Sequence, residues 1–106
     1  MADLQKIKDL TSQIAREFSP DRIILFGSHA YGQPRDDSDV DILVVLPFQG
    51  KPVRKAIEIR NKVNAGIPLD LIVRTPEQVA ERLSQNDWFI RDIVERGRTL
   101  YEANHK

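Results

Sequence analysis

Hydrophobic residues recur along this chain in two patterns, one typical of helices and one typical of strands. From residue 3 to residue 18 they follow one another at spacings of three and four, which predicts a helix with a single buried stripe. Continuous apolar runs at 23–26 and 40–46 predict strands that are covered on both faces. The predicted elements are a helix at 3–18, a strand at 23–26, a short helix at 28–32, a strand at 40–46, a helix at 53–64, a strand at 69–74, a helix at 76–84, a helix that follows Asn86 and runs to about 96, and a short edge strand at 99–101.

This alternation of strands and helices indicates an α/β or α+β layer fold. Thr75, a proline at the first helical position and Gln78 have the spacing of a capping box, which fixes the start of one helix. No linker, repeat or shift in composition divides the chain. Residues 1–106 are therefore expected to form a single domain.

Composition and charge exclude several classes of function. Sixteen Lys and Arg balance sixteen Asp and Glu, which argues against a protein that grips an extended nucleic acid. No apolar run approaches the ~18–20 residues that cross a bilayer, and the first residues lack the pattern of a signal peptide. We therefore expect a cytoplasmic protein that does not associate with membranes. There is no cysteine and only His29 and His105 offer imidazole, so any metal would be a hard cation held by carboxylates.

Asp39 and Asp41 are the first candidate ligands for such a cation. They lie two residues apart on a predicted strand, so both carboxylates point to the same face. Two like charges held this close repel each other, and a bridging divalent cation removes that repulsion. The alternative is that Asp39 caps the strand and Asp41 pairs with a distant arginine.

Gly27 and Ser28 form a candidate phosphate site between the first two strands. Gly27 ends a buried strand, and its missing Cβ allows a phosphate to approach closely. Ser28 offers a hydroxyl and a backbone N–H at the start of a short helix, whose N-terminus favours anions. The alternative is ordinary turn chemistry at a strand end.

Asp70 is the third candidate carboxylate, since it interrupts an apolar strand where a lone buried charge is costly. If its strand lies beside the strand of Asp41, Asp70 can join the pair as a third ligand; a salt bridge to Arg74 or Arg60 is the alternative. Three carboxylates next to a phosphate site describe a two-metal centre for phosphoryl or nucleotidyl transfer. We expect Asp39 and Asp41 to bridge both cations and Asp70 to complete the site of the cation that activates the nucleophile.

Gly27, Ser28, Asp39 and Asp41 also form the pattern G-S-x10-D-x-D, in which ten residues separate Ser28 from Asp39. This pattern resembles the signature of the DNA polymerase beta-like nucleotidyltransferase superfamily. The length, the Leu-Phe-Gly-Ser strand end and the final segment 97–102 are similar to the stand-alone minimal nucleotidyltransferases, or MNT domains, over nearly the whole chain.

The resemblance implies a small mixed β-sheet flanked by helices. It implies that Gly27 and Ser28 hold a nucleoside triphosphate, that Asp39 and Asp41 hold magnesium, and that Asp70 is the third acidic residue. It further implies transfer of a nucleoside monophosphate, AMP from ATP, to a hydroxyl acceptor. Minimal nucleotidyltransferases are typically paired as antitoxins with a HEPN-domain toxin, so the implied acceptor is a tyrosine of that partner; the oligomeric state is left open.

Some features depart from this family pattern or carry a weaker signal. Many relatives have arginines where this chain has His29 and Tyr31, which would alter a contact with the triphosphate or the partner. Trp88 and Phe89 are expected to pack in the core. The basic segment 51–62 is expected to be a solvated helix face, and a docking surface for an acidic partner is the alternative. Four positions of this helix are expected to face inward: Val53, Ala56, Ile57 and Val63.

Two other functions compete with the transferase. A nucleotidyltransferase-like binding module would neutralise a partner by contact without turnover, and it would not need all three carboxylates. A magnesium-dependent phosphatase or nuclease would not need the Gly-Ser site for a triphosphate. The joint presence of the three carboxylates and the Gly-Ser pair favours the transferase.

Overall fold

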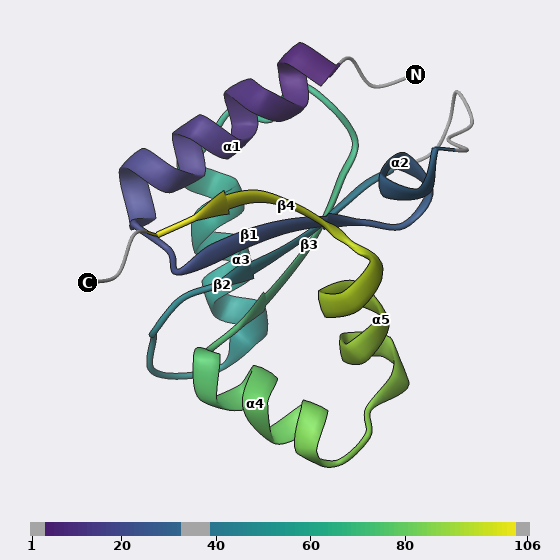
Figure 1. The fold of residues 1–106 in the computed structure, drawn as a ribbon. Coiled ribbons are helices and arrows are strands. Elements are labelled where there is room, and N and C mark those ends of the chain that lie inside the picture. The colour runs from purple at the N-terminus through teal and green to yellow at the C-terminus, as the bar shows by residue number, and fades with distance from the viewer. Residues whose placement is uncertain (1–3, 33–38, 104–106) are drawn as a thin grey trace.

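The computed structural model describes residues 4–32 and 39–103, and Figure 1 shows the arrangement of its helices and strands. The elements are α1 (Leu4–Phe18), β1 (Arg22–Phe26), α2 (Ser28–Tyr31), β2 (Val40–Val45), α3 (Pro52–Lys62), β3 (Leu69–Arg74), α4 (Pro76–Ser84), α5 (Trp88–Arg96) and β4 (Arg98–Glu102). Their order and bounds agree with the sequence prediction to within about two residues. The capping box of α4 is also confirmed, because the side chains and backbone amides of Thr75 and Gln78 bond reciprocally.

The four strands form one mixed sheet in the order β3-β2-β1-β4. β1 is antiparallel to both β2 and β4, whereas β2 and β3 are parallel and are joined by the crossover helix α3. The sequence prediction of a small mixed sheet flanked by helices is therefore confirmed. No helix in the described ranges combines the length and the hydrophobicity needed to cross a bilayer.

Each face of the sheet is covered by its own pair of helices, with α1 above and α4 and α5 below in Figure 1. Side chains of α1 and α3 pack on the first face together with alternate residues of the strands, such as Ile23 and Ile42. Side chains of α4 and α5 pack on the second face against the intervening residues, such as Ile24 and Leu43. β1 and β2 are buried on both sides, as predicted, but the edge strand β3 alternates between buried and more exposed residues.

Two positions of α3 differ from the prediction. Val53 and Ile57 were expected to face inward, but they are 63% and 53% exposed. Ile59 is the buried residue of α3, and the two other predicted positions do face the core: Ala56 is partly buried, and Val63 is buried just after the helix ends. The reason is that α3 lies over the edge strand β3, where the sheet covers only a narrow strip of the helix surface.

Candidate functional site

Gly27 places the start of α2 directly against β2. Its backbone has φ 72° and ψ −159°, a conformation that only glycine adopts without strain. A Cβ added at Gly27 would collide with the carboxylate of Asp41, so the side of the turn that the sequence analysis assigned to a phosphate faces Asp41. The helical hydrogen bonds of α2 begin with the amides of Ala30 and Tyr31, both donated to the carbonyl of Gly27, so the amides of Ser28 and His29 precede them.

Asp41 and Asp70 lie side by side on neighbouring strands. They are register partners in the parallel pair β2/β3, so both side chains point to the face that α4 and α5 cover. The pKa of Asp41 is raised from 3.8 to about 6, first by burial and then by the neighbouring Asp70 and by the charge of Asp39, whereas the charge of His29 opposes this rise. At neutral pH these carboxylates therefore repel one another.

Asp39 lies immediately before β2 and is exposed, as is Asp70. The structure thus places Asp41 beside Asp70 and Gly27, and Asp39 is close enough for its charge to act on Asp41. The predicted convergence of all three carboxylates is not seen: in residues 4–32 and 39–103, no three acidic or histidine side chains stand close enough together to hold a metal ion. Because Asp39 and Asp70 are exposed, their side chains can turn toward a cation without disrupting packed structure.

The alternative partners of Asp70 are engaged elsewhere. Arg60 donates to the backbone carbonyl of Leu69 at 2.9 Å, and Arg74 donates to the carbonyl of Val73 at 2.7 Å. Neither arginine forms an ion pair with Asp70 in the described part of the chain. Asp70 and Asp41 are neighbours, and neither forms an ion pair with a lysine or arginine of the described residues, which is an arrangement that a cation would stabilise.

Tyr31 ties the short helix α2 to α5. Its hydroxyl donates to Asp92 at 2.9 Å, and the guanidinium of Arg96 lies 4.6 Å from its ring centroid and 3.2 Å from Asp92. Tyr31 therefore links α2 to α5 and helps to hold α2 in place. The sequence analysis did not find this contact, and the only signal for it was the i,i+4 spacing of Asp92 and Arg96 on a predicted helix.

Trp88 and Phe89 are not core residues, so their sequence prediction was wrong. Trp88 is 82% exposed and Phe89 is 53% exposed, because α5 begins at the Asp87 cap and buries Ile90 and Ile93 instead. The ring of Phe89 meets the ring of Phe26 edge to face, with centroids 5.8 Å apart. Phe26 is the register partner of Asp41, so Phe89 lies near the carboxylates, and Trp88 is the residue that precedes it on α5.

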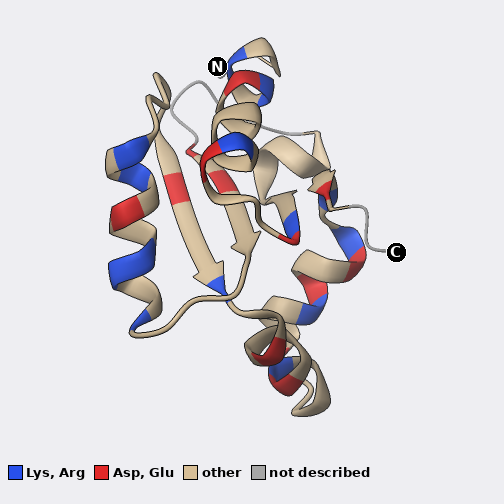
Figure 2. Ribbon diagram, turned by 90° about the vertical axis from the view of Figure 1, so that its left-hand side faces the viewer, with Lys and Arg blue, Asp and Glu red and all other residues tan. Residues whose placement is uncertain are grey.

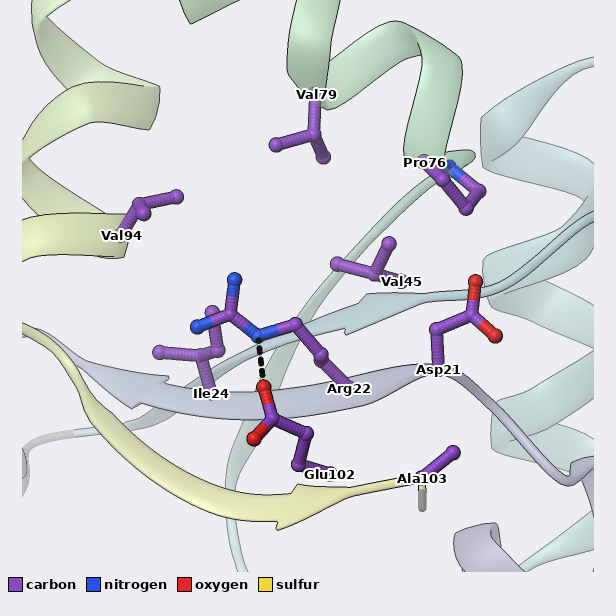
Figure 3. A pocket seen from close by; sticks show the side chains of 9 residues that line it. All are labelled: Asp21, Arg22, Ile24, Val45, Pro76, Val79, Val94, Glu102 and Ala103. Atoms are coloured by element: carbon purple, nitrogen blue, oxygen red, sulfur yellow. Dashed lines mark ion pairs between the residues drawn. The ribbon is translucent and has the colours of Figure 1, made fainter. Parts of the chain in front are cut away.

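A separate cavity of about 520 Å³ lies under α4 and α5, and Figure 3 shows its lining side chains. The cavity lies where β1 begins and β2 ends, beside Arg22 and Val45. Asp41 lies at the other end of this strand pair. Arg22 and Glu102 form an ion pair across its rim at 3.5 Å. None of the predicted site residues lines this cavity, so it is not part of the carboxylate site.

Comparisons with known proteins agree with this site. Residues 5–101 match the family model described as a nucleotidyltransferase domain. The chain is 34% identical to the "Putative protein adenylyltransferase MJ0604" of Methanocaldococcus jannaschii over 82 residues. This aligned segment covers 76% of this chain and 77% of that relative. Its fold is similar to that of a solved structure described as a putative nucleotidyltransferase from Sulfolobus solfataricus, with a TM-score of 0.65 at 20% identity over 93% of this chain and 79% of that one. The matched segment contains the Gly-Ser turn and all three carboxylates, and the chain belongs to the nucleotidyltransferase domain family.

Proposed function

We propose that this chain is a magnesium-dependent nucleotidyltransferase that moves AMP from ATP to a hydroxyl group of a protein acceptor. The observation that carries the proposal is the pairing of Asp41 with Asp70 across β2 and β3, directly beside the Gly27 turn. Family membership supports transfer chemistry as such. The nucleotide, the metal and the acceptor are argued below from the residues around the pair.

The donor set fits a hard divalent cation. Asp39, Asp41 and Asp70 offer only carboxylate oxygens, which are the ligands that Mg²⁺ prefers. The pKa of Asp41 is raised by burial and then by the neighbouring carboxylates, and a bound cation would offset both effects. We assign these three residues to hold magnesium, with two ions as the expected number. When bound, magnesium would neutralise charge on the transferring phosphoryl group.

Gly27 and Ser28 are assigned to the triphosphate. The hydroxyl of Ser28 and the amides at the start of α2 are donors next to the carboxylates, where the β- and γ-phosphates would lie. In the transfer, the acceptor oxygen forms a bond to the α-phosphorus of ATP. The bond between the α-phosphorus and the oxygen that bridges it to the β-phosphorus breaks. Pyrophosphate leaves with that oxygen, and the acceptor hydroxyl loses its proton as the new ester forms.

The exposed aromatic surface of Trp88 and Phe89 favours a nucleotide over a simpler phosphate. Aromatic side chains stack on any nucleobase, and a tryptophan this exposed has a free ring face to offer. A phosphatase that needed only the phosphate would not use this surface. This is the observation that separates the transferase from the phosphatase alternative.

A protein acceptor is supported by the relative in Methanocaldococcus jannaschii, whose name describes a protein adenylyltransferase. We propose a tyrosine of a HEPN-domain partner as the acceptor and an antitoxin role for the chain.

The test is to incubate the purified chain with α-labelled ATP, magnesium and the protein encoded beside its gene. We expect label on a tyrosine of that protein, no label when EDTA is present, and none with Asp41→Asn. Neutralisation of the partner without any label would establish the binding module instead. Release of labelled AMP with no labelled protein would establish a hydrolase.

A further inference from the structure

Helix α3 carries most of the unbalanced positive charge near the edge of the sheet. The segment 51–62 has five Lys and Arg residues and a single acid, Glu58, and Figure 2 shows the basic positions spread along the helix. Lys55 pairs with Glu58 at 3.1 Å, and Arg60 donates to a backbone carbonyl. Lys51 and Arg54 have no ion pair in the described part of the chain, so the N-terminal half of α3 is left positive.

The same half of α3 exposes two large aliphatic side chains. Val53 and Ile57 are four residues apart, so they are neighbours on the helix surface and form one apolar strip. Single exposed aliphatic residues are ordinary, but an adjacent pair that the sheet leaves uncovered beside a groove indicates a contact surface.

A groove of about 460 Å³ runs between this half of α3 and the edge strand β3. Six of its eight lining residues are apolar, among them Val53, Leu71 and Val73. The other two are Lys51 and Arg74, and no carboxylate lines it. An apolar floor with only positive charge at its rim fits a ligand that is itself apolar and flanked by negative charge.

Arginine side chains cover part of the free edge of β3, which hinders the addition of another strand. The carbonyls of Pro68 and Arg74 accept hydrogen bonds from β2. Because successive carbonyls of a strand point to opposite sides, the carbonyls of Leu69 and Val73 face the free edge. Both of these carbonyls are occupied by arginine side chains, Arg60 and Arg74. Charged side chains over the edge are a usual protection against strand pairing, so an occupant would contribute side chains, as a helix does.

We propose that this groove is a docking site for a partner protein, which presents an amphipathic helix with aliphatic side chains flanked by Asp and Glu. The aliphatic side chains pack on Val53 and Ile57, and the acidic side chains pair with Lys51, Arg54 and Arg74. The groove lies on β3, the strand that carries Asp70. At about 3.3 Å per residue, Val73 is about 10 Å along the strand from Asp70, so a docked partner is held close to the carboxylates. That this partner is the acceptor rests on the proposed function; the docking site does not.

The test uses three labelled helical peptides of equal length and measures fluorescence anisotropy without ATP. The first peptide has Leu at i and i+4 flanked by Glu, the second has Lys in place of Glu, and the third has Ser in place of Leu. We expect the Glu/Leu peptide to bind at least about tenfold more tightly than either of the others. Equal binding of all three, or no binding, overturns the proposal.

Variants locate the binding on the chain. Ile57→Asp and Arg54→Glu should each weaken binding of the Glu/Leu peptide by about tenfold or more, with Val53→Asp as a second apolar variant. Leu4→Asp is the matched control, because Leu4 is also 53% exposed but lies on α1, and it should bind as wild type does. All four positions are exposed, so a thermal melt should confirm that each variant folds.

Two further outcomes decide against the proposal. Wild-type affinity in both Ile57→Asp and Val53→Asp would place peptide binding elsewhere. Tighter binding of an oligouridine RNA than of the Glu/Leu peptide, lost in Arg54→Glu, would make the surface a nucleic-acid site. The peptide-binding experiment contains no ATP, so a negative result in it does not bear on AMP transfer. Each of the two proposals can therefore be wrong while the other is right.

Discussion

The two faces of β2 differ although their residues alternate along one strand. Three residues on the side of α1 and α3 are fully buried: Val40, Ile42 and Val44. On the other side Leu43 and Val45 are buried under α4 and α5, but Asp41 is only partly covered. One face is therefore closed along its whole length, whereas the other is open at the end where β2 begins.

The opening has a structural cause. α5 covers β1 and β2 as far as the contact between Phe89 and Phe26, and the short helix α2 leaves the sheet at Gly27. Asp41 lies at the level of that contact, as the register partner of Phe26, and next to Asp70 on the edge strand. The closed face provides the stability that holds the strands in register, and the open end presents the carboxylates to solvent. Substitutions on the two faces should consequently affect different properties.

Asp41→Asn should have the largest effect, and it should act on transfer rather than on folding. The substitution removes a charge from the proposed metal site, where several kcal/mol of transition-state stabilisation are supplied, so we expect AMP transfer to fall by more than about 100-fold. Partner binding should persist, since the docking groove lies elsewhere. Transfer of labelled AMP and a pull-down of the same pair measure both, and wild-type transfer by the variant would remove the proposed metal role from Asp41.

Ile42→Ala is the matching substitution on the closed face, one residue further along β2. A fully buried isoleucine truncated to alanine leaves a cavity, so the free energy of unfolding should fall by about 2–5 kcal/mol. Urea denaturation measures this change. The fraction that remains folded should transfer AMP at nearly the wild-type rate. Loss of transfer in fully folded Ile42→Ala would show that the two faces are not separable.

The strands and the placement of Asp41 beside Asp70 could be predicted from the sequence for the same physical reason. Buried strands form unbroken apolar runs, so a charge such as Asp41 or Asp70 within a run is conspicuous, and period two determines its face. The juxtaposition of Asp41 and Asp70 needed only the assumption that their strands are neighbours, which the parallel pairing supplies. The metal and nucleotide roles of these residues stay predictions.

The failures concern helices, where the pattern does not show how much of the surface is covered. Ile57 lies near the buried stripe of α3, and only the position of α3 over an edge strand decides that it is exposed. Trp88 occupies the first position of α5, where the Asp87 cap turns the chain before the packed stripe begins. Both errors arose because tertiary placement, which single-sequence periodicity does not contain, determines burial.

Ser28→Ala should have a smaller effect than the substitution of Asp41, because it removes one hydrogen bond and leaves the backbone amides in place. Loss of a hydrogen bond to a charged group costs about 1.5–3 kcal/mol, which corresponds to a decrease of about 10- to 150-fold in kcat/KM for ATP. Steady-state kinetics with ATP measures it. Ser28→Thr, which keeps a hydroxyl, is the control and should recover most of the activity; equal loss in both variants would indicate disruption of α2 instead.

Trp88→Ala tests whether the open end of the sheet recognises a nucleobase. Stacking on an aromatic side chain contributes about 1–3 kcal/mol, so the Kd for magnesium ATP should rise by about 5- to 150-fold. Binding of inorganic tripolyphosphate, which has no base, should be unchanged, and isothermal titration calorimetry with both ligands separates the two cases. Equal weakening of both ligands would show that Trp88 acts on the phosphate site and not on a base.

The smallest effect is a pH dependence confined to the open face. The folded-state pKa of Asp41 is raised from 3.8 to about 6 by burial and by Asp70, so between these values the folded chain binds more protons than the unfolded chain. Stability contributed by this carboxyl is therefore present at low pH and is lost as pH rises through about 6. Asp41→Asn has no proton to lose, so relative to wild type it should gain stability between pH 4 and pH 7 in EDTA. Because the carboxyl is only partly buried, water screens the interaction and the gain is modest. Urea denaturation of both proteins across this range measures the difference. An identical pH dependence of the two proteins would show that the charged form of Asp41 does not destabilise the metal-free fold.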